Sequence, residues 1–219
     1  MIPPPQRQLP IFPLSSVLFP QMMLPLQVFE DRYKRMLRDC LEADSRFGVA
    51  LIKEGAEVGE PATPHTIGTV ARIRRVSPGE DGRYGVLVLG ERRFRIREML
   101  QWKPYEKAVV SFPVEIEGDP PMSTNEVEAI RYKAAVFLRT LLGLQGGWSR
   151  KVESPTDPID LSYYIASVTR GDPRRQQEIL EALSARKRLE LLLPLIESGA
   201  EANTKEMQER FLLKGTRLN

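Results

Sequence analysis

The chain has 219 residues, enough to bury one substantial hydrophobic core or two modest ones. Its 42% hydrophobic and 28% charged residues are ordinary for a globular protein and exclude disordered and fibrous classes. The net charge of +3 is mildly basic, so nucleic-acid binding would require that charge to gather on one face. With Cys40 and His65 as the only residues of their types, an internal disulfide, a cysteine-based zinc site and a multi-histidine metal site are excluded. We expect no cofactor.

The stretch between Arg7 and Glu30 carries no charge, and four prolines interrupt it: Pro10, Pro13, Pro20 and Pro25. Each proline costs about 3 kcal/mol or more inside a helix, and unpaired backbone groups are not tolerated in lipid, which excludes a membrane span. A signal-peptide cleavage site is also missing. The stretch therefore predicts two strands, "LPIF" and "MMLPLQVF", joined by the turn "SSVLFPQ". We expect a cytoplasmic protein without a membrane partner.

An amphipathic helix is predicted from Glu30 to about Ala43. Its apolar residues recur at positions i, i+3, i+4, i+7 and i+8, which places them on one helix face: Tyr33, Met36, Leu37, Cys40 and Leu41. Because Cys40 lies on this stripe, it is expected to be a packed core thiol and not a reactive one.

Strands are predicted over residues 47–52, 68–76, 84–91, 92–100 and 107–116, with turn residues between most of them. In "RRFRIREML" the side chains alternate: Phe94, Ile96 and Leu100 point to one face, and Arg93, Arg95 and Arg97 to the other. The spacing is typical of a sandwich or barrel. Residues 1–117 are thus predicted to form a β domain with one helix.

After the linker "EGDPPM" the pattern is helical. Ser123 and Glu126 form a predicted capping box, and Asp157 and Pro158 mark the start of a second helix. A third helix is expected over residues 173–198, with a kink or interruption at Pro194. The predicted organisation is an α+β protein: a β domain (1–117), a helical domain (123–198) and a polar tail (199–219) that is partly helical or disordered.

Catalytic motifs are missing from the sequence. It contains neither the P-loop pattern nor the G-x-S-x-G nucleophile elbow. The serine in "GGWSR" is the only one in a glycine-rich turn, and an interhelical loop explains it better. We therefore predict that the protein is not an enzyme.

Two surfaces are candidates for binding. The apolar turn residues Phe19, Met22 and Met23 could contact a partner, although each of them could equally belong to the core. A basic strand surface could engage phosphates, although neighbouring glutamates also allow cross-strand ion pairs. Its residues are Arg72, Arg74, Arg93, Arg95 and Arg97.

Several strings together resemble the amino-terminal domain of Lon-family ATP-dependent proteases. They are "LPIFPLSSVLFPQMMLPLQVFEDRYKRML", "GTVARIRRV", "VLVLGERRFRI", "DPIDLSYYIASV" and "RQQEILEALSARKRLELLLPLIE". The resemblance covers residues from about Leu9 to Glu197. It implies a PUA-like β pseudobarrel followed by an α-helical bundle, which helps to recognise substrate proteins.

The ATPase motifs and the serine–lysine protease domain of that family have no counterpart here. The resemblance therefore implies a stand-alone, non-catalytic module that binds unfolded proteins or peptides, with a protease or another protein as a further partner. RNA binding by a PUA-like fold is the alternative.

Overall fold

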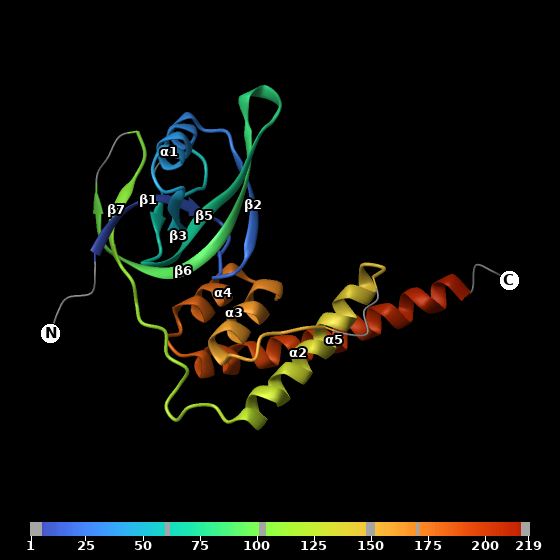
Figure 1. Ribbon diagram of the computed structural model, residues 1–219. Coiled ribbons are helices and arrows are strands. Elements are labelled where there is room, and N and C mark those ends of the chain that lie inside the picture. Colours follow the sequence, from blue (N-terminus) through green and yellow to red (C-terminus); the bar gives the residue numbers. More distant parts are fainter. Residues whose placement is uncertain (1–5, 60–61, 101–103, 148–151, 170, 216–219) are drawn as a thin grey trace. The chain divides into compact units, whose positions relative to one another are not determined.

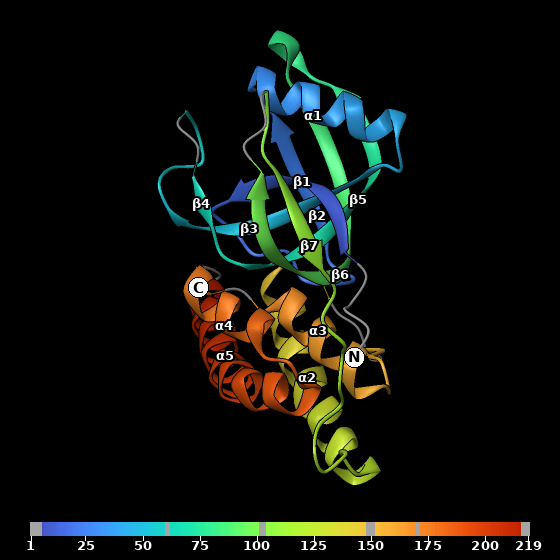
Figure 2. The same ribbon diagram turned by 90° about the vertical axis from the view of Figure 1, so that its left-hand side faces the viewer.

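The computed structural model describes residues 6–59, 62–100, 104–147, 152–169 and 171–215. Figures 1 and 2 show their secondary structure from two directions. The chain divides into two compact units. The first comprises Met1–Val114 and Arg170–Glu181, and the second comprises Glu115–Thr169 and Ala182–Asn219. The serine of "GGWSR" lies outside the described residues.

The first unit is built on a sheet of seven described strands. Five of them pair in the closed order β1–β7–β6–β5–β3–β1, in which only β1 and β3 run parallel. β2 pairs with the first half of β6, and β4 with the end of β3. The strand bounds are β1 (Gln6–Leu14), β2 (Met23–Val28), β3 (Arg46–Glu54), β4 (Thr63–Pro64), β5 (Ile67–Pro78), β6 (Tyr84–Leu100) and β7 (Lys107–Ser111). The protein is therefore a mixed α and β protein, as predicted.

The proline-rich opening stretch forms strands β1 and β2, as predicted. The amide of Ile11 donates to the Glu106 carbonyl (3.0 Å), so the nitrogen of the neighbouring Pro10 faces away from β7. At the start of β2, the amide of Gly90 in β6 donates to the carbonyl of Met22, the residue that directly precedes β2 (2.9 Å). The alternation then puts the nitrogen of Pro25 on the edge of β2 that no described strand pairs with. The missing amide proton of Pro10 therefore removes no hydrogen bond to β7, and that of Pro25 removes none to β6.

Helix α1 (Asp31–Glu42) lies across one end of the strand ring (Figure 2). Four residues of the predicted stripe are buried: Tyr33, Met36, Leu37 and Cys40. Leu41, at the margin of that stripe, is instead 46% exposed. Cys40 is buried, which confirms that it is a core residue, and burial raises the pKa of its thiol to about 12, which disfavours the reactive thiolate.

Two predicted strands, 84–91 and 92–100, are a single strand in the structure, β6. It pairs with β5 over most of its length and with β2 and β7 in succession on its other edge. The hairpin between β5 and β6, closed by the short 3₁₀ helix η1 (Glu80–Gly82), extends from the ring in Figure 1.

The predicted helix 173–198 is two helices. α4 (Pro173–Glu181) belongs to the first unit, and α5 (Ala185–Gly215) belongs to the second unit. The break arises because the first amides of α5 are bound elsewhere: Ala185 donates to the Ile116 carbonyl (2.9 Å) and Arg186 to that of Glu117 (2.8 Å). The buried Arg188 guanidinium also donates to the Ala182 carbonyl (2.9 Å), which fixes the connecting turn.

Helix α4 packs on the outer side of the strand ring within the first unit. The Gln177 side chain donates to the Ile67 carbonyl of β5 (3.0 Å), and the Arg93 guanidinium of β6 donates to the Leu180 carbonyl (2.8 Å). Because α4 covers it, Arg93 is only 2% exposed.

The second unit contains α2 (Thr124–Leu144), α3 (Pro158–Val168) and α5. The predicted capping box of Ser123 and Glu126 is present, and the Asp157 side chain caps α3 by accepting from the Asp160 amide (2.9 Å). α5 continues through Pro194 as one helix, so of the predicted kink or interruption the interruption is wrong, and the kink stays a prediction. Pro194 is exposed, where water can satisfy the carbonyl that loses its amide partner. None of the helices described is long and apolar enough to cross a membrane.

Candidate functional site

Of the predicted apolar turn residues Phe19, Met22 and Met23, only a part is exposed to solvent. Phe19 is 1% exposed, which corrects its assignment to a partner-binding surface. It is buried because the turn is bound to β6: Gln21 donates to the Gly90 carbonyl (2.7 Å), and Gly90 donates to Met22. Met22 is partly buried against the core that includes α1, whereas Met23 is 45% exposed. Of the three residues, Met23 contributes most of the surface that a partner could reach.

The five predicted basic residues do not form one face. Arg93 is buried under α4, so it cannot belong to a basic surface. Arg72 lies 3.5 Å from the Glu91 carboxylate, and Arg97 donates to the Ser111 hydroxyl (2.7 Å). Arg74 is exposed and Arg95 is half-buried. Neighbouring carboxylates and hydroxyls therefore take up part of the donor capacity that the sequence assigned to phosphates.

A different set of arginines surrounds a cavity of about 270 Å³ in the first unit. Arg7, Arg46 and Arg92 line it together with Leu9, Val70, Glu91 and Phe112. No local sequence pattern indicates this group, since its members come from β1, β3 and β6. Strand register brings them together; it also places Arg46 opposite Arg72.

The carboxylates among these arginines are ionised. Hydrogen bonds from the Arg46 guanidinium, at 2.6 and 3.1 Å, lower the pKa of Glu91. Burial opposes ionisation of Asp44, but hydrogen bonds and charge from Arg7 and Arg46 outweigh it and lower the pKa of that carboxyl.

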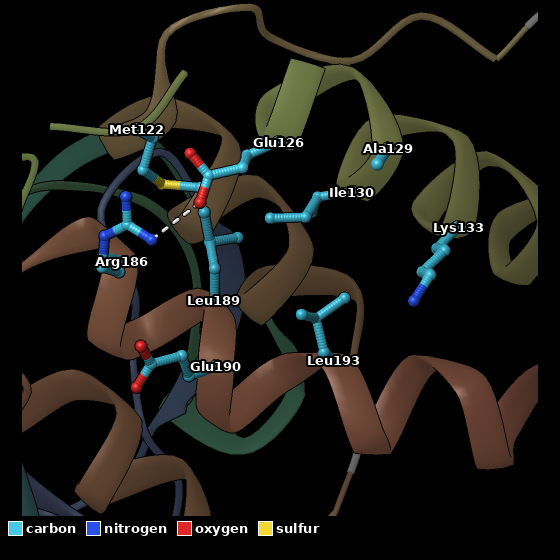
Figure 3. Close-up of a pocket in the computed structure, with 9 residues that line it drawn as sticks. All are labelled: Met122, Glu126, Ala129, Ile130, Lys133, Arg186, Leu189, Glu190 and Leu193. Atoms are coloured by element: carbon cyan, nitrogen blue, oxygen red, sulfur yellow. Dashed lines mark hydrogen bonds and ion pairs between the residues drawn. The ribbon is translucent and has the colours of Figure 1, made fainter. Parts of the chain in front are cut away.

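A groove of about 260 Å³ lies between α2 and α5 in the second unit (Figure 3). Its lining residues recur at helical spacing on both helices, so that each helix presents one face to it. Ile130 and Leu189 are buried and form the floor. The other apolar lining residues are Met122, Ala129 and Leu193, and the charged ones are Glu126, Lys133, Arg186 and Glu190.

α2 and α5 run parallel and stay in contact beyond the groove, where Asn203 of α5 donates to the Thr140 hydroxyl of α2 (3.2 Å). There, glycines remove side chains from the contact: a Cβ on Gly199 would lie 2.7 Å from the Phe137 ring, and one on Gly143 would lie 2.9 Å from Met207. Two ion pairs join the helices on either side of the groove, Glu126–Arg186 (2.9 Å) and Lys133–Glu197 (2.6 Å).

The charged rim of the groove is held in place. Arg186 donates to the Glu126 carboxylate and to the carbonyls of Pro120 and Pro121 (3.2 Å each). The same carboxylate accepts from the Ser123 amide (2.7 Å). These hydrogen bonds, that from Arg186 foremost, lower the pKa of Glu126 to about 2. The result is an apolar floor with a rim of paired charges, a surface suited to receive an apolar side chain.

Comparison with known proteins finds relatives for nearly the whole chain. The family described as the ATP-dependent protease La (LON) substrate-binding domain matches residues 8–198. Lon protease 2 of Myxococcus xanthus is 33% identical over an alignment of 201 residues that covers 88% of this chain and 24% of that protein. The Lon protease of Anaeromyxobacter dehalogenans is 31% identical over 88% of this chain and 23% of its own length. The chain thus spans about a quarter of the length of these relatives.

Two solved structures have a similar fold. The Lon N-terminal domain protein from Xanthomonas campestris superposes with a TM-score of 0.62 at 28% identity, over 86% of this chain and 98% of that one. The N-terminal domain of the Mycobacterium avium complex Lon protease superposes with a TM-score of 0.65 at 20% identity, over 87% of this chain and 98% of that one.

Proposed function

Because the chain belongs to the substrate-binding domain family of Lon proteases, we propose that it is a recognition module that binds polypeptide segments of other proteins and catalyses no reaction. The groove between α2 and α5 carries this proposal. Its partners would be unfolded proteins or peptides, together with a protease or other protein that uses the module. A reducing, cytoplasmic location agrees with a single buried cysteine.

We also propose that the first unit is a PUA-like β pseudobarrel and the second a helical bundle. The closed order of five strands supports the first assignment, and the packing of α2 and α3 against α5 supports the second. The limits 1–117, 123–198 and 199–219 belong to the same proposal. The contact-based first unit differs from them by taking in residues 170–181.

The size of the groove favours one side chain as its occupant. Sites for drug-sized ligands enclose about 300–1,000 Å³, more than the groove offers. Burying a leucine or phenylalanine side chain completely contributes about 1.5–3 kcal/mol. A single contact of this strength gives weak binding of many sequences, which is what recognition of unfolded polypeptides requires.

The charges at the groove support binding over catalysis. A general acid or base works best when its pKa lies near the operating pH. The pKa of Glu126 is moved the other way, to about 2, and Glu190 is paired with Lys187 at 3.2 Å. Both carboxylates therefore serve to fix the rim.

Met23 and the adjacent Met22 remain proposed contacts in the first unit, since the exposed thioether of Met23 can adapt to varied apolar partners. RNA binding is the less supported alternative. It would need a row of available cations along one face, and burial of Arg93 and pairing of Arg72 with Glu91 interrupt such a row.

The test is a binding measurement with matched peptides and variants. Fluorescence anisotropy would compare a labelled 12-residue peptide carrying one central phenylalanine with the same peptide carrying serine. We expect about tenfold tighter binding of the phenylalanine peptide, and we expect Ala129→Glu to remove that preference because it places a charge in the lining of the groove. Ala129 is exposed, so the variant should fold.

The control is Ala202→Glu, which adds the same charge at an exposed position of α5 outside the groove. It should keep the preference. If neither peptide binds to the native protein, the proposed function is wrong. If Ala129→Glu binds both peptides as the native protein does, the groove is not the site.

A further inference from the structure

The arginine-lined cavity of the first unit has an excess of positive charge. Among the described residues, Arg7, Arg46 and Arg92 line the cavity with the carboxylate of Glu91, while Arg72 pairs with Glu91 and Asp44 pairs with Arg7 and Arg46. We propose that this cavity binds an oxyanion, and that its physiological occupant is the carboxylate of an aspartate or glutamate on a bound polypeptide. The choice of occupant rests on the proposed polypeptide-binding function; the oxyanion site itself does not.

Arg92 is the residue that we expect to bind the oxyanion, because the other arginines already belong to ion pairs. Its guanidinium carbon lies 3.5 Å from the centre of the Phe112 ring. Stacking on an aromatic ring holds the plane of the guanidinium and leaves the N–H groups at its edge free to donate. In the described part of the chain, Arg92 has no carboxylate partner, whereas Arg7, Arg46 and Arg72 each have one.

The surrounding groups are positioned before any ligand arrives. Arg46 binds Glu91 through two nitrogens, and Glu91 also lies 3.5 Å from Arg72. This network fixes Arg46 and Glu91 at the cavity, and two guanidiniums share the one carboxylate of Glu91. Leu9, Val70 and Phe112 supply apolar walls. Arg92 is exposed, so its guanidinium can donate a charge-assisted hydrogen bond to an entering carboxylate.

The geometry favours a single oxyanion on a polypeptide over a nucleic-acid backbone. A nucleic acid is bound through a series of phosphate contacts, and the cavity offers one stacked, unpaired guanidinium. Arg93, next to it in β6, is buried beneath α4. A peptide needs only one such contact, beside others made by its apolar side chains.

The experiment uses the full chain and two labelled 12-residue peptides that differ at one position, aspartate in one and asparagine in the other. Each carries the same central phenylalanine. We expect the aspartate peptide to bind about tenfold more tightly at low salt, and Arg92→Gln to reduce this ratio to about one without changing the affinity for the asparagine peptide. Arg75→Gln, at an exposed position of β5 that does not line the cavity, should keep the ratio.

Four outcomes separate the two proposals. If the asparagine peptide binds and the ratio is one in the native protein, the oxyanion site is wrong and the polypeptide-binding function stands. If the affinity ratio of the two peptides is kept in Arg92→Gln, another part of the protein recognises the aspartate, and the proposed site is wrong. If neither peptide binds, inorganic phosphate decides: an NMR shift of the Arg92 side-chain N–H that is lost in Arg92→Gln supports the site, and no shift overturns it. Tighter binding of oligo(U) than of the aspartate peptide, lost in Arg92→Gln, would overturn the polypeptide as occupant.

Discussion

Residues that the sequence assigned to a surface proved buried where a distant segment covers them. Phe19 is turned inward by backbone hydrogen bonds to Gly90, and Arg93 is covered by α4. Neither segment is near them in sequence, so local alternation of apolar and charged residues could not reveal the burial. Cys40 was predicted correctly because its stripe is periodic within one helix.

The titration of Glu126 provides a test at single-residue scale. Hydrogen bonds from Arg186 and Ser123 lower its pKa from the ordinary value of 4.5 to about 2. A lowered folded-state pKa means that the stabilisation from this carboxylate is fully present above about pH 4.5 and is lost as the pH falls toward about 2. NMR titration of the Glu126 carboxyl carbon should give a midpoint near pH 2.

Arg186→Gln should raise that midpoint toward 4.5, because the first cause of the shift is removed. Arg175→Gln, which removes an arginine that pairs with Glu178 in α4, should leave it unchanged. A midpoint near 4.5 in the native protein would show that the rim of the groove is not held as described.

Secondary-structure elements were predictable where their signals are local. The capping box at Ser123, the Asp157–Pro158 start and the strands around the prolines depend on residues within a few positions. The break between α4 and α5 was not predictable, because the carbonyls of Ile116 and Glu117 create it from a distant part of the chain. The groove could not be foreseen for a similar reason: it depends on where Gly143 and Gly199 let two helices approach.

Gly90 in β6 offers a test at the scale of one element. A Cβ at this position would lie 2.1 Å from the Phe19 carbonyl oxygen, a backbone atom that cannot rotate away. Gly90→Ala must therefore displace the turn before β2, and we expect a loss of about 3 kcal/mol or more in the free energy of unfolding. Urea denaturation followed by circular dichroism measures it.

Gly85→Ala is the matched control, since it lies in the same strand and its Cβ would be no closer than 3.8 Å to its surroundings. It should change the free energy of unfolding by less than about 1 kcal/mol. Equal urea midpoints for the two variants would contradict the close contact between the turn and β6.

At the scale of the whole molecule, composition separated a strand-rich part from a helical part, and the family resemblance extended over both. What composition could not assign was α4, which lies among helices in sequence but contributes to the strand-rich unit. Two hydrogen bonds explain this: Gln177 donates to the Ile67 carbonyl of β5, and Arg93 of β6 donates to the Leu180 carbonyl. Amphipathic spacing identifies a buried face but not the element that buries it.

The place of α4 leads to a prediction about fragments. A fragment of residues 1–117 loses the hydrogen bonds from Gln177 to the Ile67 carbonyl and from Arg93 to the Leu180 carbonyl. A fusion in which a Gly/Ser linker of about 15 residues, with an r.m.s. reach of about 20 Å, joins residue 117 to residues 171–181 should restore them. We expect the fusion to be more stable than the fragment by about 2 kcal/mol or more, from apolar burial and two hydrogen bonds. Urea denaturation of both proteins measures the difference.

Substitutions within the fusion show whether the stability comes from the described contacts. Gln177→Ala should lower the free energy of unfolding of the fusion by about 1 kcal/mol, because the buried Ile67 carbonyl loses its donor. Arg174→Ala changes an exposed side chain of the same helix and should have little effect. If the fragment and the fusion unfold at the same urea concentration, α4 does not stabilise the strand ring, and the strands of residues 1–117 are sufficient for its stability.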